Sequence, residues 1–568
     1  MKKINFLNSE KIFRLTPLSG DSVDVANKII QKNVKVFPKL KSVLVENLSD
    51  LWEMQFTSSP STYCLYIYAL YPVSYLLNAF EQTGDEKYLE QATELTLNFI
   101  SWESKKKLIS EKKSKILYGD HAVSNRTQTM CYLVCCLWSC DKKIPQPVVA
   151  TLLNNGNYLA DEENYSHYNH GLMMDLALVG LLNIFKKLEC TYPKDIEDKL
   201  SHRLERSLVR DLTKDGVHIE NSPGYHFWML GFLERISPSL ELFNKDLFDK
   251  AASALMKARE YAQYVTRPDR TVPQIGDTHA GVKHVTSDTL PSKFFPNSNQ
   301  VIFRSPAGKS WAILSSGYKT HVHKHEDNGA FNLFYSGIDI FMDPGFLNYE
   351  SDEDSVSIRA ASSHNVPLPY GHNKQSIKRL NIEDFAATGE NLSRSDILAF
   401  YKGQSIEAAL ALIADYESSD IFRMIVKLGE HAFFIFDMLD IGEGLESRFT
   451  LGPSLNVIET NDSNTLILQG SLDVKVEQVL LHKAIANVTS DKVTCAIGFG
   501  EKKLNNQLCL GSKTDHNVTY VEFQQHSLSL HKEMIAKMIL FRMRQDKGDV
   551  NLEELINEIE FVFLENMG

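Results

Sequence analysis

The sequence predicts two large domains, the first built from α-helices and the second from β-strands. Two observations support this prediction: helical periodicity prevails before residue 290, and strand patterns prevail after a change near residue 295. A chain of 568 residues is also long enough to bury more than one large core. We therefore predict a helical domain over 1–295 and a β domain over 296–568.

Apolar residues recur at helical spacing in the N-terminal half. In 85–101, Tyr88, Ala92 and Leu95 lie three or four positions apart, and Asp85 is a suitable N-cap. Similar apolar faces occur in 63–80, 127–138, 171–185 and 225–236. Helical segments joined by short polar loops predict antiparallel helix pairs that pack against one another.

A linker and a series of strands follow. Pro291, Pro296 and the Asn-Ser-Asn at 297–299 indicate the linker. Segments of β-forming residues, separated by turn residues such as Gly337 and Gly429, predict strands at 301–304, 311–315, 330–335, 338–342, 422–426, 432–436, 465–469 and 518–523. This pattern predicts a large all-β domain of stacked sheets.

Composition excludes several classes of protein. Hydrophobic residues make up 43% of the chain and charged residues 23%, which is typical of globular proteins and not of disordered, collagen-like or coiled-coil chains. The net charge is −12, whereas a general nucleic-acid binder needs a positive field. The overall charge would also repel an acidic polymer at long range, although one cleft needs only a few local donors.

The sequence shows no signal peptide and no membrane span. Asn5, Asn8 and Glu10 interrupt the apolar stretch that a signal peptide needs, and no window approaches about 18 uncharged apolar residues. We expect a cytoplasmic protein, or a periplasmic or secreted one if a leader has been removed. The eight cysteines do not indicate a disulfide scaffold, and the four in 130–140 are expected to be buried thiols rather than metal ligands.

Two loops that precede predicted helices carry reactive groups. Residues 164–171 place polar, aromatic and imidazole groups at a helix start, where free N–H groups can hold an anion. Residues 220–226 (Glu-Asn-Ser-Pro-Gly-Tyr-His) place Tyr225 at another helix start, where a phenol with a perturbed pKa can act as an acid or a base. The alternative interpretation is a capping loop in the first case and a Pro-Gly turn in the second.

Three histidines alternate in the segment 321–327. If this segment is a strand, period two puts His321, His323 and His325 on one face, about 7 Å apart at each step. One cavity would then receive both a free histidine and a metal-bound one. His325, Asp343 and His364 together would supply two imidazoles and one carboxylate, which is a partial zinc shell. The alternative is that Asp343 is an ordinary turn residue and His364 an ordinary loop residue.

The order of these motifs resembles that of the heparinase II/III-like polysaccharide lyases, a superfamily that includes glycosaminoglycan and alginate lyases. The resemblance covers most of the chain. It implies an α+β multidomain protein in which an N-terminal (α/α) toroid of helical hairpins precedes a C-terminal antiparallel β-sandwich. The matching motifs lie at 168–171, 221–226, 273–277 (Pro-Gln-Ile-Gly-Asp), 323–327, 343–345 (Asp-Pro-Gly) and 363–365 (Ser-His-Asn).

The resemblance implies β-elimination at a uronic acid, which leaves a 4,5-unsaturated product. A base must remove the C5 proton, a donor must stabilise the developing negative charge, and an acid must protonate the leaving oxygen. Asn169, with His170 beside it, matches the group that neutralises the substrate carboxylate. Tyr225 matches the acid, which for one C5 epimer is also the base. His323 matches a base on the sandwich side, with His170 in that role for the other epimer.

The resemblance also implies a metal and further substrate contacts. His325, Asp343 and His364 match structural zinc ligands, and a metal there would fix the loop beside His323 rather than activate water. His121 and Arg126 match a substrate-cleft segment, and we expect His121, Arg126 and Asn365 to contact the substrate, the arginine through its anions. The site is expected between the two domains, where clefts often lie.

Several alternatives remain. The extra histidine, His321, makes the register of 321–327 ambiguous by two residues. A zinc metallo-hydrolase is a rival because of the His-x-His-x-Asp pattern at 323–327, although Asn328 stands where that motif needs a histidine. A non-catalytic glycan-binding or assembly protein on the same scaffold is another rival, because a fold does not determine function. The sequence leaves open the uronate polymer, endo or exo action and the oligomeric state.

Overall fold

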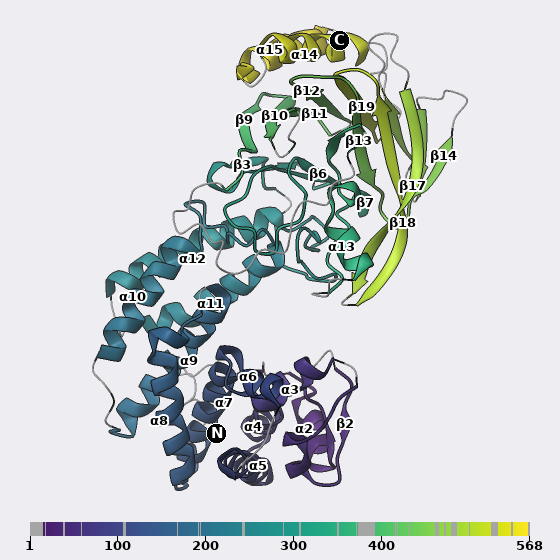
Figure 1. Ribbon diagram of the computed structural model, residues 1–568. Helices are drawn as coiled ribbons and strands as arrows, with labels where there is room; N and C mark the ends of the chain where they lie inside the picture. The colour runs from purple at the N-terminus through teal and green to yellow at the C-terminus, as the bar shows by residue number, and fades with distance from the viewer. Residues whose placement is uncertain are drawn as a thin grey trace. The chain divides into compact units, whose positions relative to one another are not determined.

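The computed structural model describes most of the chain, whose course is shown in Figure 1. The described residues are 15–16, 19–37, 40–57, 59–105, 110–166, 168–190, 192, 195–240, 245–287, 289–305, 308–348, 352–370, 372, 392–414, 416, 419–430, 432–459, 465–470, 473–478, 486–498, 500–523, 532–546 and 549–565.

Contacts group the chain into two compact units. One comprises Met1–Val209 with Phe232–Ala252, and the other comprises Arg210–Gly231 with Ser253–Gly568. This grouping divides helices α11 (Pro223–Leu240) and α12 (Lys245–Val265) between the two units. The domain boundary at residue 295 stays a prediction.

The first unit is helical, as predicted. Its helices are α2 (Ser22–Ile30), α3 (Pro60–Tyr68), α4 (Tyr71–Thr83), α5 (Glu86–Lys105), α6 (Glu111–Leu117), α7 (Asp120–Ser139), α8 (Gln146–Ala160), α9 (Tyr168–Lys187) and α10 (Asp195–Arg210). Strands β1 (Asn33–Val34) and β2 (Val43–Leu44) pair antiparallel. Helix α7 is buried on every side, and its Cys131, Cys135 and Cys136 are buried free thiols, as predicted. The fourth cysteine of that segment, Cys140, follows the helix and is only partly buried. Closure of the helices into a toroid stays a prediction.

The single helix predicted over 63–80 is two helices. Helix α3 ends at Tyr68 and α4 begins at Tyr71. Leu70 between them has a left-handed backbone, with φ 60°. Pro72 in the first turn of α4 has no N–H to donate to a preceding turn, so a continuous helix would lose a hydrogen bond there. The apolar periodicity continues across this break and therefore does not reveal it.

The described part of the second unit forms three antiparallel sheets, which confirms the predicted C-terminal β-sandwich architecture. The five-stranded sheet has the order β3 (Lys293–Phe295), β4 (Gln300–Arg304), β5 (Ser310–Ser315), β6 (Ala330–Tyr335) and β7 (Ile338–Phe341). The eight-stranded sheet has the order β14 (Asn456–Glu459), β15 (Thr465–Gln469), β16 (Asp473–Gln478), β19 (His516–Glu522), β12 (Ala432–Leu439), β11 (Ile421–Leu428), β10 (Ile406–Ile413) and β9 (Asp396–Lys402). The four-stranded sheet has the order β17 (Ala486–Gly498), β18 (Glu501–Ser512), β13 (Leu445–Thr450) and β8 (Pro367–Pro369).

Alternate residues of the five-stranded sheet face two different cores. Phe303 and Leu314 belong to the core that this sheet shares with the eight-stranded sheet. Ile302 and Ile313 point the other way and pack with Tyr261 of α12. This alternation follows from the period of two in a strand. Because both faces of the sheet are covered, its central strands β4, β5 and β6 are buried along almost their whole length.

The C-terminal region contains two helices in addition to the strands that were predicted for it. Helices α14 (Lys532–Asp546) and α15 (Leu552–Glu565) lie over β10, β11 and β12 in Figure 1. Ile539 of α14 and Ile556 of α15 share a core with Met424 of β11. The eight-stranded sheet is therefore covered on both faces, by the sandwich core and by this helical layer.

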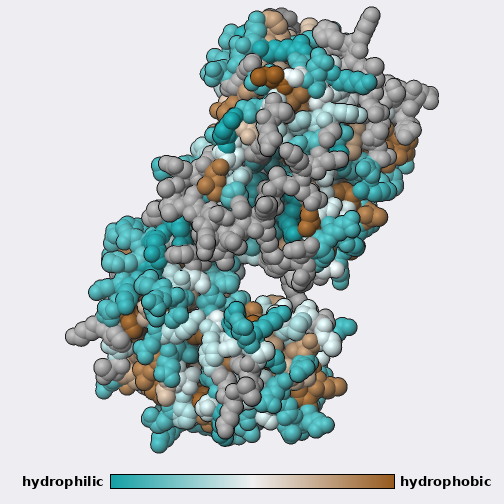
Figure 2. Space-filling model, in the orientation of Figure 1, coloured by the Kyte–Doolittle hydropathy of each residue, from teal (hydrophilic) through white to brown (hydrophobic). Residues whose placement is uncertain are grey.

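The exposed apolar side chains of the described residues are scattered. On the face seen in Figure 2, hydrophobic residues form small patches among hydrophilic ones. Exposed large apolar side chains such as Val285, Ile441 and Phe541 come from different parts of the chain. Among the helices described, none is long and apolar enough to cross a membrane.

Candidate functional site

The predicted site residues fall into two groups, one in each compact unit. Tyr225 and His323 belong to the second unit, together with the three predicted metal ligands. Asn169, His170 and His121 belong to the first unit. His167, in the motif that contains Asn169, lies outside the described residues.

Tyr225 and His323 are in direct contact. Tyr225 lies in the first turn of α11, which begins at Pro223, a position where the missing N–H of proline is no loss. The backbone N–H of Tyr225 is 3.5 Å from the capping oxygen of Ser222. The Tyr225 ring stacks on the imidazole of His323, with 3.7 Å between ring centroids and 17° between ring planes. The structure thus brings the two predicted acid-base side chains together.

The segment that carries the alternating histidines is a loop, so the condition that it forms a strand is not met. Residues 321–329 form turns and bends between β5 and β6. His323 has a φ of 56°, in the left-handed region that an extended strand does not visit. The histidines therefore do not share one face of a strand. His323 lies against Tyr225, whereas His321 packs edge-on to Tyr318, 4.9 Å between centroids.

Two buried carboxylates face the two nitrogens of His323. Nδ1 donates a hydrogen bond to Oδ2 of Asp277 at 2.6 Å, and Nε2 lies 3.4 Å from Oε2 of Glu220. Glu220 is fully buried, and its Oε2 also lies 3.5 Å from Nε2 of His218. Burial acts to lower the pKa of His218, but the Glu220 carboxylate outweighs it and raises that pKa. Both acids belong to motifs in the sequence, but the sequence predicts no role for either.

Asp277 also contacts a second histidine. Its Oδ1 accepts a hydrogen bond from Nε2 of His325 at 3.0 Å. Burial acts to raise the pKa of the Asp277 carboxyl, but the hydrogen bonds from His323 and His325 outweigh it and hold this pKa well below its ordinary value. Asp277 is therefore an ionised acceptor for two imidazoles.

Backbone contacts hold the loops of this group together. The side-chain amide of Asn221 donates to the carbonyls of Thr320 at 2.6 Å and Val322 at 2.9 Å, which ties the loop before α11 to the histidine loop. Gly276, with φ 55°, fits between them. A Cβ atom at this position would lie 2.5 Å from the Asn221 carbonyl oxygen and 2.9 Å from that of His323. Only glycine fits here without displacing backbone atoms.

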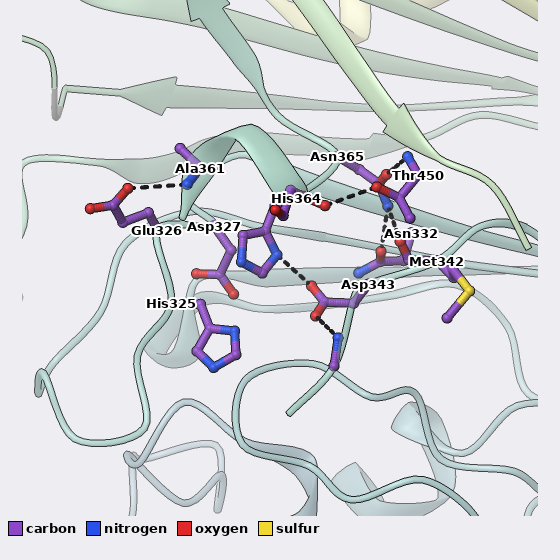
Figure 3. Close-up of polar contacts among 12 residues, drawn as sticks. His325, Glu326, Asp327, Asn332, Met342, Asp343, Ala361, His364, Asn365 and Thr450 are labelled. Atoms are coloured by element: carbon purple, nitrogen blue, oxygen red, sulfur yellow. Dashed lines mark hydrogen bonds and ion pairs between the residues drawn. The ribbon is translucent and has the colours of Figure 1, made fainter. Parts of the chain in front are cut away.

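His325, Asp343 and His364 form a buried cluster, as predicted for a metal site. One possible ligand atom from each lies within 4.8 Å of the others. Nδ1 of His364 donates to Oδ2 of Asp343 at 3.0 Å, as Figure 3 shows. Nδ1 of His325 and Nε2 of His364 are buried and have no hydrogen-bond partner among the described residues. Because such nitrogens are costly to leave unsatisfied, they are suited to a cation, and the donor set of two imidazoles and a carboxylate fits zinc.

The group in the first unit centres on Asp120, at the start of α7. Its carboxylate accepts hydrogen bonds from Ser166 and, at 3.1 Å, from Nδ1 of His170. Burial acts to raise the pKa of Asp120, but the hydrogen bonds from these two partners lower it to about 2. His121 lies edge-on to His170, 5.5 Å between centroids. Burial lowers the pKa of His121 to about 4, so this imidazole is neutral at pH 7. Asn169, next to His170 in the first turn of α9, is partly exposed.

Two models of one protein family match this chain. The heparinase II/III N-terminus matches residues 71–303, and the heparinase II/III-like C-terminal domain matches residues 287–519. The chain belongs to the heparinase II/III family. Membership of this family makes it a polysaccharide lyase by class. No curated protein matches it by sequence.

Solved structures of heparinases share this fold. A mutant of heparan sulfate lyase HepC from Pedobacter heparinus has a TM-score of 0.66 at 15% identity, and the match covers 92% of this chain and 88% of HepC. A structure of heparinase III has a TM-score of 0.68 at 16% identity, with 93% and 90% covered. At this identity the likeness describes the fold alone.

Two of the residues expected to contact substrate in this heparinase II/III protein are interior. Arg126 is 1% exposed, and its Nη1 donates to the carbonyls of Tyr68 at 3.2 Å and Leu117 at 3.1 Å. A guanidinium enclosed in this way braces helices α3 and α6 against α7. The structure therefore gives Arg126 a structural role in place of the expected contact to substrate anions.

Asn365 is also an internal brace. Its side-chain amide donates to Oδ1 of Asn332 at 2.7 Å and to the carbonyl of Met342 at 3.0 Å, and its Oδ1 accepts from the N–H of Thr450 at 2.7 Å (Figure 3). The residue is fully buried. Its side chain joins β6, β13 and the residue after β7, beside His364, so the expected substrate contact is corrected to a structural role.

Proposed function

We propose that this polysaccharide lyase cleaves a uronic-acid-containing acidic polysaccharide by β-elimination, with Tyr225 and His323 as its acid-base pair. The observation that supports this proposal best is the stacked contact of the two rings, 3.7 Å between centroids. Two proton-transferring groups at this separation can serve adjacent positions of one sugar unit.

The proposed reaction removes and adds one proton. A base takes the proton from C5, the C5–H electron pair forms the C4–C5 double bond, and the C4–O bond breaks. Tyr225 then protonates the departing glycosidic oxygen, and it is also the base for one C5 epimer. His323, oriented by Asp277 at 2.6 Å, is the second basic group beside it. Atoms balance without water, because the proton lost at C5 is matched by the proton gained at the leaving oxygen.

The negative charge that develops at the uronate carboxylate needs a hydrogen-bond donor to stabilise it. Asn169 and His170 are proposed for this role, and His121 for a neighbouring contact. An asparagine amide donates a hydrogen bond without carrying a proton that it can lose, so it can stabilise an enolate-like intermediate throughout the reaction. The partial exposure of Asn169 and His170 is consistent with contact to a ligand.

A structural zinc ion is proposed at His325, Asp343 and His364. Two buried nitrogens that have no hydrogen-bond partner in the described part of the chain, and the adjacent carboxylate, support this assignment. A bound zinc ion would supply a cross-link between the histidine loop and the segments after β7 and α13. His325 would thereby be held in place two residues from His323.

Glycosaminoglycan-like chains are the first substrates to test, because heparinase III and a heparan sulfate lyase share the fold. Alginate and bacterial exopolysaccharides offer the same uronate chemistry and are the alternative substrates.

The experiment is a panel of uronate polymers, read by the ultraviolet absorbance of the conjugated double bond. A parallel reaction in isotopically labelled water separates the reaction classes: a lyase product gains the absorbance and no labelled oxygen, whereas a hydrolase product gains labelled oxygen and no absorbance. Binding without either product would mean that the protein is a glycan-binding protein.

A further inference from the structure

The carboxylate of Asp277 joins the two functional parts of the second unit. One oxygen accepts from Nδ1 of His323 at 2.6 Å, and the other accepts from Nε2 of His325 at 3.0 Å. Asp277 itself is 7% exposed. The acid-base histidine and the candidate metal ligand therefore share one buried acceptor that comes from a different segment of the chain.

These two hydrogen bonds select a tautomer for each imidazole. A carboxylate only accepts, so His323 carries its proton on Nδ1 and His325 carries its proton on Nε2. The lone pair of neutral His325 is then on Nδ1, the buried nitrogen in the cluster with Asp343 and His364. Nε2 of His323 is the nitrogen that Asp277 does not hold, and it lies 3.4 Å from Oε2 of Glu220. A carboxylate bonded to the outer nitrogen of a metal-binding histidine is a recurring second partner in zinc sites.

We infer that Asp277 is a positioning residue that couples the metal cluster to His323. The inference rests on the proposed function, since it assigns His323 to the reaction. Residues 321–329 are turns and bends, so no strand ladder sets the directions of their side chains. The Asn221 amide ties the loop backbone at Thr320 and Val322, and Asp277 orients the imidazoles of His323 and His325. Loss of either the carboxylate or the metal then disturbs the same imidazole.

The test compares Asp277→Asn, Asp277→Glu and Glu407→Gln with the unchanged full-length protein. Glu407 is a buried acid paired with Lys427 at 3.1 Å in the sheets, so its variant controls for removal of a buried carboxylate. Zinc affinity is measured by competition with a chromophoric chelator, and kcat and KM are measured on the polymer that the panel identifies. Circular dichroism confirms folding.

Asp277→Asn is expected to fold, to bind zinc about 10–100-fold more weakly and to lose kcat by a similar factor, with KM within about twofold. An asparagine presents one acceptor and one donor, so one imidazole must change its tautomer. Asp277→Glu restores part of both losses, and Glu407→Gln changes neither quantity. Unchanged zinc affinity and kcat in Asp277→Asn would overturn the inference, and loss of kcat alone, with full zinc affinity, would overturn the coupling.

The two proposals fail in different ways. If the unchanged protein acts on no uronate polymer, the proposed function fails, whereas zinc affinity still measures the effect of Asp277 on the cluster. In that case the nitrogen chemical shifts of isotopically labelled His323 and His325 replace kcat as the second readout. One of the two imidazoles is expected to change its tautomer in Asp277→Asn, and unchanged tautomers of both histidines would overturn the inference.

Discussion

The carboxylate of Glu220 and the imidazole of His323 lie 3.4 Å apart, from Oε2 to Nε2, at the nitrogen that Asp277 does not hold. The hydrogen bond from Nδ1 to Asp277 restrains the imidazole in its own plane, and the Tyr225 ring packs against one of its faces. A side chain restrained in this way is oriented before a ligand arrives, and preorganisation of this kind lowers the barrier of the chemical step.

Removal of the Tyr225 hydroxyl should stop the reaction. Tyr225→Phe keeps the ring on His323 but removes the proton that the leaving oxygen needs, so kcat should fall about 10²–10⁴-fold with little change in KM. The ultraviolet assay measures this directly. Tyr370→Phe, at a tyrosine that is 59% exposed, is the matched control and should keep full activity. An active Tyr225→Phe protein would refute the role of Tyr225 as acid.

Asn169→Ala should lower kcat about 10²–10³-fold, because one donor to a developing negative charge is lost. Asn164→Ala, in the same segment, controls for local disturbance, since Asn164 bonds only to Tyr158 and Asp161 in the described structure. Single-turnover rates with saturating substrate separate this effect from weaker binding. Equal rates for the two variants would argue against a role for Asn169 at the carboxylate.

Zinc should stabilise the folded protein. At a free concentration about 100 times its dissociation constant, a ligand that binds only the folded state adds about 2.7 kcal/mol. Chelation of the purified protein should lower its melting temperature, and added zinc should restore it. In His364→Ala the response to zinc should disappear, while His372→Ala, at a histidine outside the cluster, should keep it. A zinc response of the same size in His364→Ala would place the ion elsewhere.

Gly276→Ala should lower both stability and activity. The added Cβ meets the backbone oxygens of Asn221 and His323, and alanine is strained at φ 55°. The positive φ alone costs about 1 kcal/mol or more. Gly84→Ala is a close control, because Gly84 has φ 70° but open space around it. Denaturant unfolding should show a larger loss for Gly276→Ala, and only this variant should lose activity beyond its loss of folded protein.

His226 should contribute to acid sensitivity. Burial lowers its pKa from 6.5 to about 3 in the folded state, where Nε2 donates to the Ala258 carbonyl at 2.9 Å. Because the folded pKa is depressed, the unfolded state binds the extra proton first. The stabilising contribution of neutral His226 is therefore present above pH 6.5 and is lost as the pH falls towards 3.

The measurement for His226 is the slope of unfolding free energy against pH, which should be shallower in His226→Gln by up to about 1.4 kcal/mol per pH unit. Comparing slopes separates this effect from any loss of stability that does not depend on pH. His372→Gln is the control, and its slope should equal that of the unchanged protein. Equal slopes in all three proteins would contradict the assignment.

Much of the architecture could be predicted because it depends on local periodicity. The strands at 330–335 and 465–469 match β6 and β15, since β-branched and aromatic residues lie between clear turns. The loop at 321–329 could not be predicted, because alternating residues look the same in a strand and in a series of turns. The periodicity also gave no sign of the helix break at Leu70.

The candidate site was predictable to the extent that its residue types are unusual. Tyr225, His323 and the three metal-binding candidates stand out as motifs, and the structure brings each set together. Arg126 could not be placed correctly, because α7 is buried on every side and sequence does not tell which of its polar groups face inward. Glu220 and Asp277 were missed as functional because acids are usually surface residues, and only tertiary contacts reveal their burial.

The two hydrogen bonds from Asn221 span 99 and 101 residues of sequence. Contacts between such distant segments close a large loop, so they form late and slowly compared with helices and hairpins. A partly folded chain can thus hold its sheets and helices while Tyr225 and His323 are still apart. Recovery of lyase activity during refolding would then lag behind recovery of secondary structure. The rate at which activity returns would measure how fast Tyr225 and His323 come together.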